Sequence, residues 1–300
     1  MHRQIRETQV EFGQQGDRVR ATLVSPEVEG RRPAVVMGHG WGMVADGTLL
    51  DFARALARTG LVVLAFDYRR LGRSEGHPRQ DLDPYAQIED FRDALTYLSG
   101  RPEVDPDRLG VWGTSYGGGH VLVLSATDYR VRCAVAQVPS ISGSRAAAQR
   151  LDADKIAQQR QLFHAARAEA LAGAGLTMVS TVTGGEHEFV TYPDEESRAY
   201  MAGQGAICPT WRNETTLRSV EKARWYEPGC YADQIRPPLL MVVAAGDRVT
   251  PTNLQREAYA RIPEPKGWVE VPGGHYVVYD TFFQEAATAA ADWFHRWLAQ

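Results

Sequence analysis

A single serine surrounded by glycines is the strongest chemical signal in the sequence. Residues 110–120 are GVWGTSYGGGH, and within them Gly113, Ser115 and Gly117 fit the pattern G-x-S-x-G. An apolar run precedes the pattern and a helix-forming run follows it, which predicts a sharp strand-to-helix turn at Ser115. Glycines on either side of such a turn avoid Cβ clashes, and the hydroxyl is then presented beside the free N–H groups of the helix. The pattern therefore indicates a nucleophilic serine.

A serine nucleophile needs a base, and His275 is the favoured candidate among the eight histidines. It lies in VPGGHYVVY, directly after the apolar segment WVEV, on a loop that can carry its ring to the edge of a sheet. His120 lies in the helix predicted after Ser115 and is expected to point away, and His295 is expected on the surface of the last helix. His187 has acidic neighbours that suggest a metal ligand, but no second histidine lies at ligand spacing, so we expect a solvated turn there.

The histidine in turn needs an acid that orients its ring, and Asp247 fits this role. It ends the apolar run LLMVVAAGD and precedes RVTP, so a strand would deliver it to the same edge of the sheet. The alternative is an ordinary turn or helix-capping aspartate, which is common in such positions. The coincidence of Ser115, Asp247 and His275 at successive strand ends favours a catalytic triad.

Two backbone N–H groups are predicted to form an oxyanion hole. One belongs to Tyr116, directly after the serine, and the other to Trp41 in the glycine-rich segment GHGWG. Such donors must already point to the place where negative charge develops. Gly40 lets this backbone come close to the substrate, and His39 is expected to brace the loop without transferring a proton.

The elements that would position these residues follow an α/β pattern. Residues 8–26 predict an antiparallel hairpin, after which apolar strands and amphipathic helices alternate with short connections. This alternation predicts a parallel sheet with helices on both faces and with its functional loops at the carboxyl ends of the strands. The predicted strands lie within 33–42, 61–67, 107–115, 130–140, 237–247 and 267–275, and the helices within 46–60, 83–100, 116–127 and 281–300.

The alternation is interrupted by a long insertion at residues 145–236. It begins with a helical stretch and continues with mixed polar and aromatic segments, so we expect an inserted helical lid between core segments 1–144 and 237–300. Aromatic side chains of a lid can line an apolar pocket above the nucleophile. The alternative is that they form the lid's own core or a contact within a homodimer. The residues expected to contact substrate are Phe163, Phe189, Trp211 and, beside the predicted base, Tyr276.

Composition excludes several other classes of protein. The 300 residues are 44% hydrophobic and carry a formal net charge of −4, with no basic stripe that would indicate nucleic-acid binding. Three widely spaced cysteines argue against a disulfide framework or a zinc site and favour a reducing compartment. The beginning of the sequence has no apolar signal region and no run is long enough to span a membrane, so we expect a cytoplasmic protein. No metal site is predicted.

Taken together, the motifs resemble the α/β-hydrolase superfamily. The segments GHGWG, FDYRRLGRSEG, GVWGTSYGGG, AAGDRVTP and VPGGHYVVY look most similar to dienelactone-hydrolase-like and prolyl-oligopeptidase-like serine esterases. The resemblance implies a mostly parallel eight-stranded sheet, with Ser115 as nucleophile, His275 as base and Asp247 as acid, in the chain order of that architecture. It also places Trp41 and Tyr116 in the oxyanion hole. Dienelactone hydrolases use cysteine as nucleophile, however, and the insertion matches no known lid.

These features lead us to expect a serine hydrolase that needs no cofactor. It would cleave carboxylic esters of a small to medium, partly hydrophobic small molecule through an acyl-enzyme. A thioesterase, an amidase or peptidase, and a C–C bond hydrolase with the same triad remain alternatives, and a perhydrolase side activity is compatible with it. An alternative of another class is a catalytically silent relative that binds a ligand.

Overall fold

An eight-stranded sheet forms the centre of the molecule in the computed structural model, which describes residues 3–299. The first two strands form the predicted hairpin and the second is also antiparallel to its other neighbour, whereas all remaining neighbours are parallel. In spatial order the strands are β1 (Ile5–Phe12), β2 (Val19–Pro26), β4 (Val62–Phe66), β3 (Arg32–Gly38), β5 (Val104–Thr114), β6 (Val131–Gln137), β10 (Leu239–Ala244) and β11 (Lys266–Val271).

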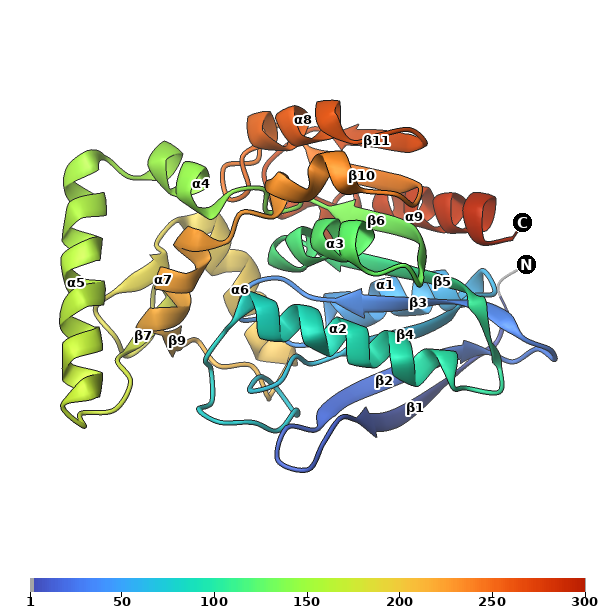
Figure 1. The fold of residues 1–300 in the computed structure, drawn as a ribbon, viewed down its shortest axis with the longest axis horizontal. Helices are drawn as coiled ribbons and strands as arrows, with labels where there is room; N and C mark the ends of the chain where they lie inside the picture. Colours follow the sequence, from blue (N-terminus) through green and yellow to red (C-terminus); the bar gives the residue numbers. More distant parts are fainter. Residues whose placement is uncertain (1–2, 300) are drawn as a thin grey trace.

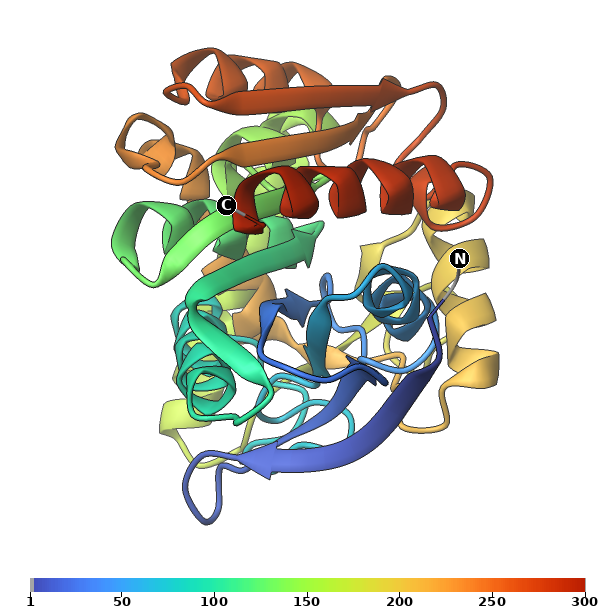
Figure 2. The same cartoon turned by 90° about the vertical axis from the view of Figure 1, so that its right-hand side faces the viewer.

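Helices cover both faces of this sheet (Figures 1 and 2). On one face α1 (Thr48–Arg58) and α9 (Phe283–Leu298) pack against a cluster of buried side chains from the central strands. On the other face α2 (Pro84–Ser99), α3 (Tyr116–Thr127) and α8 (Thr252–Arg261) pack against a second cluster. Strands that are covered on both faces are apolar at nearly every position, which is why the central strands are continuous apolar runs in the sequence.

Among these five helices, only α2 has a side-chain cap at its N-terminus. The helix α2 begins where Asp83 accepts hydrogen bonds from the N–H groups of Tyr85 and Ala86, with Pro84 as its first residue. The helix α8 was not among the predicted elements. It follows Pro251 without a side-chain cap, so no N-terminal signal marks it in the sequence.

The insertion lies at the carboxyl ends of the parallel strands, between β6 and β10 (Figure 1). The predicted helical stretch is two helices, because residue Leu151 is extended and Asp152 caps a new helix. The insertion is also not purely helical, since it contains a small three-stranded sheet in the order β8-β7-β9. Its elements are α4 (Gly143–Arg150), α5 (Ala153–Leu171), β7 (Met178–Val182), β8 (Val190–Tyr192), α6 (Glu195–Ile207), β9 (Thr215–Thr216), α7 (Leu217–Trp225) and the 3-10 helix η1 (Pro228–Gln234).

Candidate active site

Ser115 occupies a sharp turn between β5 and α3. Its φ of 57° is in the left-handed region, which a residue with a side chain adopts only when its surroundings enforce it. A Cβ atom on Gly113 would overlap the carbonyl of Gly117, and one on Gly117 would overlap the carbonyl oxygen of His39. The two glycines of the motif are therefore required by the close approach of three backbone segments, as the sequence pattern predicted.

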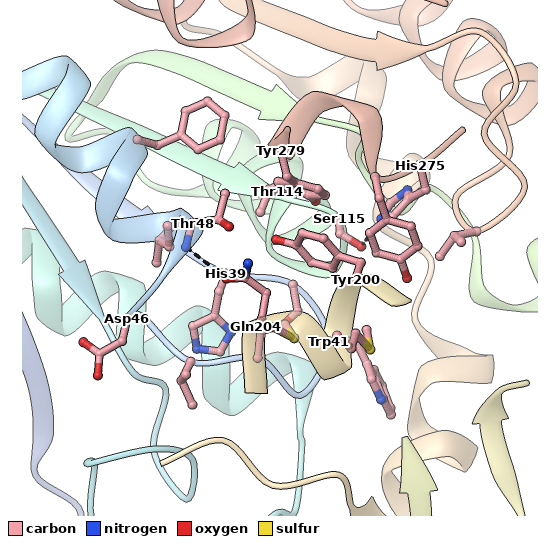
Figure 3. Close-up of a pocket in the computed structure, with 18 of the residues that line it drawn as sticks. His39, Trp41, Asp46, Thr48, Thr114, Ser115, Tyr200, Gln204, His275 and Tyr279 are labelled. Atoms are coloured by element: carbon pink, nitrogen blue, oxygen red, sulfur yellow. Dashed lines mark hydrogen bonds between the residues drawn. The ribbon is translucent and has the colours of Figure 1, made fainter. Parts of the chain in front are cut away.

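The structure brings Ser115, His275 and Asp247 into one chain of hydrogen bonds. Figure 3 shows the first two of these residues at the pocket. The Nε2 atom of His275 lies 3.0 Å from the Oγ atom of Ser115, and its Nδ1 atom lies 2.7 Å from Oδ2 of Asp247. An ionised carboxylate can only accept, so Nδ1 carries the proton and Nε2 is free to accept the serine proton. Exposed fractions of 9%, 2% and 5% for serine, histidine and aspartate leave only the hydroxyl accessible at the surface of the pocket.

Backbone groups and Thr250, which the sequence analysis did not single out, hold the carboxylate of Asp247. Its Oδ1 atom accepts from the N–H groups of Val249 and Thr250, each at 2.8 Å. The hydroxyl of Thr250 lies 2.8 Å from Oδ2 and 3.2 Å from Nδ1 of His275. These contacts fix the orientation of the carboxylate before any substrate binds. In the sequence, the only feature that could have indicated them is the threonine three residues after Asp247.

The segment after β3 lies directly against Ser115. A Cβ atom on Gly40 would lie 3.0 Å from Cβ of Ser115 and 3.4 Å from its Oγ. Tyr116 is the first residue of α3, so its N–H has no acceptor within the helix. Within residues 3–299, the N–H of Trp41 makes no hydrogen bond either. The ring of Trp41 packs edge-to-face on that of Tyr116 at 5.1 Å between centroids. Both predicted oxyanion donors thus flank Ser115 on facing segments.

Three other histidines make contacts that hold the structure together. His39 Nδ1 lies 2.9 Å from the carbonyl oxygen of Gly40, and burial lowers the pKa of its ring, so a neutral ring braces this loop. His120 is fully buried, and its ring nitrogens bond the hydroxyl of Tyr226 and the side chain of Gln87. His187 is half-buried, with its Nε2 atom 3.5 Å from Glu214. Within residues 3–299, no group of three or more His, Cys, Asp or Glu side chains is arranged to hold a metal ion.

A small pocket with a cavity volume of about 40 Å³ surrounds Ser115. From the core, apolar side chains of α1 and β5 line it, among them Leu49, Phe52 and Trp112. Tyr276, predicted to contact substrate, lines it beside the histidine. The insertion contributes Tyr192, one of its aromatic residues, and three residues that the sequence analysis did not assign to the site, namely Tyr200, Met201 and Gln204.

The helix α6 is the part of the insertion that covers this pocket, and two hydrogen bonds attach it to the core. Tyr276 donates its hydroxyl proton to Oγ of Ser197 at 2.9 Å, and the side-chain carbonyl of Gln204 accepts from the N–H of Thr48 at 3.1 Å (Figure 3). Between them, the ring of Tyr200 stacks on Tyr276 and Tyr279 at centroid distances of 4.7 and 4.9 Å. The weak amphipathic pattern of α6 did not reveal this role.

Three aromatic residues expected to contact substrate lie outside the pocket around Ser115. Phe163 lines a different cavity, between α5 and α7. Phe189 packs against the core cluster on the α2 and α3 side, and Trp211 packs on Gly205 of α6, where a Cβ atom would overlap its ring. None of the three rings lines the pocket around Ser115 because each packs elsewhere, and composition alone does not tell which face of an insertion meets the core.

No helix in the described part of the chain, residues 3–299, is long and apolar enough to cross a membrane.

Comparisons with known proteins agree with this architecture. The chain is 31% identical to the quorum-quenching protein AidA of Acinetobacter baumannii (strain MDR-ZJ06) over 90% of this chain and 88% of that protein. It is also 31% identical to the thiohydrolase aneE of Aspergillus aculeatus, over 84% and 80% of the two chains. The structure of DcsB in complex with its substrate analogue superposes with a TM-score of 0.86 at 26% identity, covering 98% of this chain and 100% of that one. A family model described as the alpha/beta hydrolase fold matches residues 33–282, and the chain therefore belongs to the α/β-hydrolase family.

Proposed function

We propose that this protein is a serine hydrolase that cleaves carboxylic esters of small to medium, partly hydrophobic molecules. The observation that carries the proposal is the continuous series Ser115–His275–Asp247, with successive contacts of 3.0 and 2.7 Å. Its terminal hydroxyl opens into a largely apolar pocket beside two free backbone N–H groups. Nucleophile, base, orienting acid and anion-stabilising donors are the groups that acyl transfer requires.

The reaction proceeds in two half-reactions. Oγ of Ser115 attacks the ester carbonyl while its proton passes to Nε2 of His275, and the N–H groups of Trp41 and Tyr116 stabilise the oxyanion. The C–O bond to the alcohol then breaks, and the alcohol leaves with the proton from His275. Water attacks the acyl-enzyme by the same route and gives its proton to Nε2 of His275. His275 then returns this proton to Oγ of Ser115 as the acyl C–O bond breaks, which releases the acid and restores the serine. Asp247 stabilises the imidazolium in both halves.

The pocket supports a short to medium apolar group on the substrate. Its lining includes Phe52 and Trp112, both fully buried, and the flexible side chains of Met43 and Met201. In this proposal residues 145–236 form a cap whose helix α6 covers that group. The closer similarity to dienelactone-hydrolase-like and prolyl-oligopeptidase-like serine esterases is part of the same proposal.

A thioester is the second candidate substrate. The same triad cleaves thioesters, and a relative that is 31% identical is named a thiohydrolase. The residues that line the pocket do not distinguish an ester oxygen from a thioester sulfur as the leaving atom. The proposal therefore requires a direct comparison of the two substrate classes.

The test compares the wild type with Ser115→Ala and with Ser144→Ala, which removes an exposed hydroxyl on α4. We expect the wild type and Ser144→Ala to be labelled by a fluorophosphonate and to hydrolyse p-nitrophenyl esters, and Ser115→Ala to do neither. A panel of p-nitrophenyl esters, acyl thioesters and aminoacyl anilides then ranks the bond types. A folded wild-type protein that takes no label and turns over no member of the panel would support a ligand-binding role instead.

A further inference from the structure

A second cavity lies between the helices α5 and α7 of the insertion and the start of α2. Its volume is about 720 Å³, which is within the range of small-molecule binding sites. The helices α5 and α7 pack against each other at the outer edge of the molecule (Figure 1). No residue that lines this cavity also lines the pocket around Ser115, so the two are separate spaces.

Apolar and aromatic side chains form most of the lining. Phe163 of α5 and Leu217 of α7 line the cavity and are buried, so they give it an apolar base. Tyr226 is buried too, and its hydroxyl is hydrogen-bonded to Nδ1 of His120 at 2.7 Å, so only its ring is available to a ligand. The ring of Tyr85 lies edge-to-face to that of Tyr226, with 6.3 Å between the centroids. The cavity therefore offers preformed aromatic surfaces.

Exposed hydrophobic side chains gather at the same cavity. Within residues 3–299, six large hydrophobic side chains are exposed to solvent, and three of them line it. These three are Tyr85, Leu171 and Trp225, with exposed fractions of 60%, 86% and 75%. Contact of such surface with water is unfavourable, and a bound apolar group would remove that contact. Single exposed hydrophobic residues need no explanation, whereas a concentration of them around one concave place marks a binding site.

The charged side chains of the lining are neutralised within the protein. Arg167 pairs with Glu221 at 2.8 Å, and Lys222 pairs with Asp83 at 2.8 Å. The remaining charged residue, Arg218, also has a carboxylate partner, at 2.6 Å. In the described part of the chain, the lining therefore keeps no unpaired charge that would attract an ion, an acidic peptide or an anionic membrane surface. Such a lining suits an uncharged ligand, because a charged one would lose hydration without gaining an ion pair.

We propose that this cavity is a second binding site, for an uncharged and largely apolar small molecule that carries an aromatic ring. The inference goes beyond the proposed hydrolase function and does not depend on it, since Ser115 takes no part. The ligand contacts the rings of Tyr85, Trp225 and Tyr226 and removes water from Leu171. A protein partner would need about 800 Å² of contact on each side and a polar rim to pair with, and the charges here are already paired.

The neutral fluorescent probe N-phenyl-1-naphthylamine tests the site. It carries two aromatic groups, and its emission rises in an apolar environment. We expect saturable binding of one molecule per chain, both to the wild type and to protein whose Ser115 is blocked by a fluorophosphonate. 1-Anilinonaphthalene-8-sulfonate has the same rings and a sulfonate, and it should bind about tenfold more weakly because its charge finds no free cation. Loss of binding when Ser115 is blocked, or equal affinity for the charged probe, would overturn the proposal.

Variants then place the probe in the cavity. Trp225→Gln and Leu171→Gln remove apolar contacts and should each raise the Kd of the neutral probe by about three- to tenfold. Ala166→Phe, at a half-buried position of the lining on α5, fills the space and should raise the Kd by about tenfold or more. Leu162→Gln is the matched control, because this exposed leucine of α5 does not line the cavity, and it should leave the Kd unchanged.

The melting temperature of each variant checks its folding, and the exposed positions 171 and 225 should leave it close to that of the wild type. An unchanged Kd in a folded Trp225→Gln/Leu171→Gln double variant, or no saturable binding to the wild type, would overturn the proposal. Sedimentation velocity separates a small molecule from a second copy of the chain. We expect the same oligomeric state for the wild type and the double variant, and a wild-type dimer that dissociates in this variant would also overturn the proposal.

Discussion

The substitution Asp247→Asn tests how the candidate triad is held. Oδ1 of Asp247 faces two N–H donors at 2.8 Å, from Val249 and Thr250, so the amide of asparagine must keep its oxygen on that side. Its NH₂ group then replaces Oδ2 and points at Nδ1 of His275, which lies 2.7 Å from Oδ2. The imidazole responds by placing its proton on Nε2, where it faces Ser115 and cannot accept the serine proton.

The size of the effect follows from the interactions that are lost. The transition state loses a charge-assisted hydrogen bond from the imidazolium, and a comparable cost is needed to return the ring to the reactive tautomer. At about 1.5–3 kcal/mol for each, the barrier rises by about 3–6 kcal/mol, which lowers kcat by a factor of about 10² to 10⁴.

The assay is steady-state hydrolysis of a p-nitrophenyl ester, together with the rate of fluorophosphonate labelling. Both rates should fall in parallel, while the melting temperature changes little because asparagine preserves the shape of the side chain. Asp280→Asn is the matched control, since Asp280 is exposed on the loop that carries His275. A folded Asp247→Asn protein with kcat within about fivefold of the wild type would refute the reasoning, because the lost interactions require a far larger change.

Three further predictions concern packing and charge. Gly40→Ala should lower kcat/KM by about tenfold with little effect on stability, because its Cβ atom would press on Ser115 at 3.0 Å and displace the nucleophile by a few tenths of an ångström. For His120, burial lowers the pKa from 6.5 to about 3, so the neutral form stabilises the fold above pH 6.5 and this contribution is lost as the pH falls toward 3. The unfolding free energy, measured in denaturant titrations, should therefore fall more steeply for the wild type than for His120→Gln as the pH decreases from 6.5 to about 3. The difference in slope should reach up to about 1.4 kcal/mol per pH unit. Asp81→Ala should lower the unfolding free energy by about 3 kcal/mol, because the fully buried carboxylate bonds Arg218 of the insertion at 2.6 and 2.8 Å and its removal leaves that charge unpaired.

Each of these predictions has a contrary result. Wild-type kcat/KM in Gly40→Ala would show that the backbone tolerates a Cβ next to the nucleophile. Parallel pH profiles of stability for His120→Gln and the wild type would show that His120 does not stay neutral. For Asp81, the exposed Asp105→Ala is the control, and an equal loss of stability in both variants would contradict the role of burial.

The core and the nucleophile turn could be predicted because their signals are local. The sequence around Ser115 has glycines at both positions of the motif, and the structure shows the overlaps that require them, one with the carbonyl of Gly117 and one with the carbonyl oxygen of His39. The alternation of apolar strands and amphipathic helices likewise follows from the burial of each element. The helices α2 and α3 accordingly lie within the predicted ranges, and the predicted hairpin is present but begins at Ile5, before the predicted residue 8.

The contribution of the insertion to the site could not be predicted in the same way. Tyr200 and Gln204 lie on α6, whose sequence has no strong apolar face, and they reach the pocket only because α6 docks on Tyr276, Tyr279 and the start of α1. Phe163 has a clear apolar character and yet lines another cavity. For the α6 residues and for Phe163 alike, the sequence gives the chemical type of each side chain, whereas long-range packing decides where that side chain lies.

The amino-acid sequence by itself determined the order of the elements and the chemical identity of the groups at the sheet edge, because propensity, periodicity and backbone sterics act over a few residues. Only the tertiary structure decided that the imidazole of His275 comes within 3.0 Å of Ser115 and that α6 covers the pocket. These contacts join residues far apart in the chain. They depend on the simultaneous packing of many side chains, which no short stretch of sequence encodes.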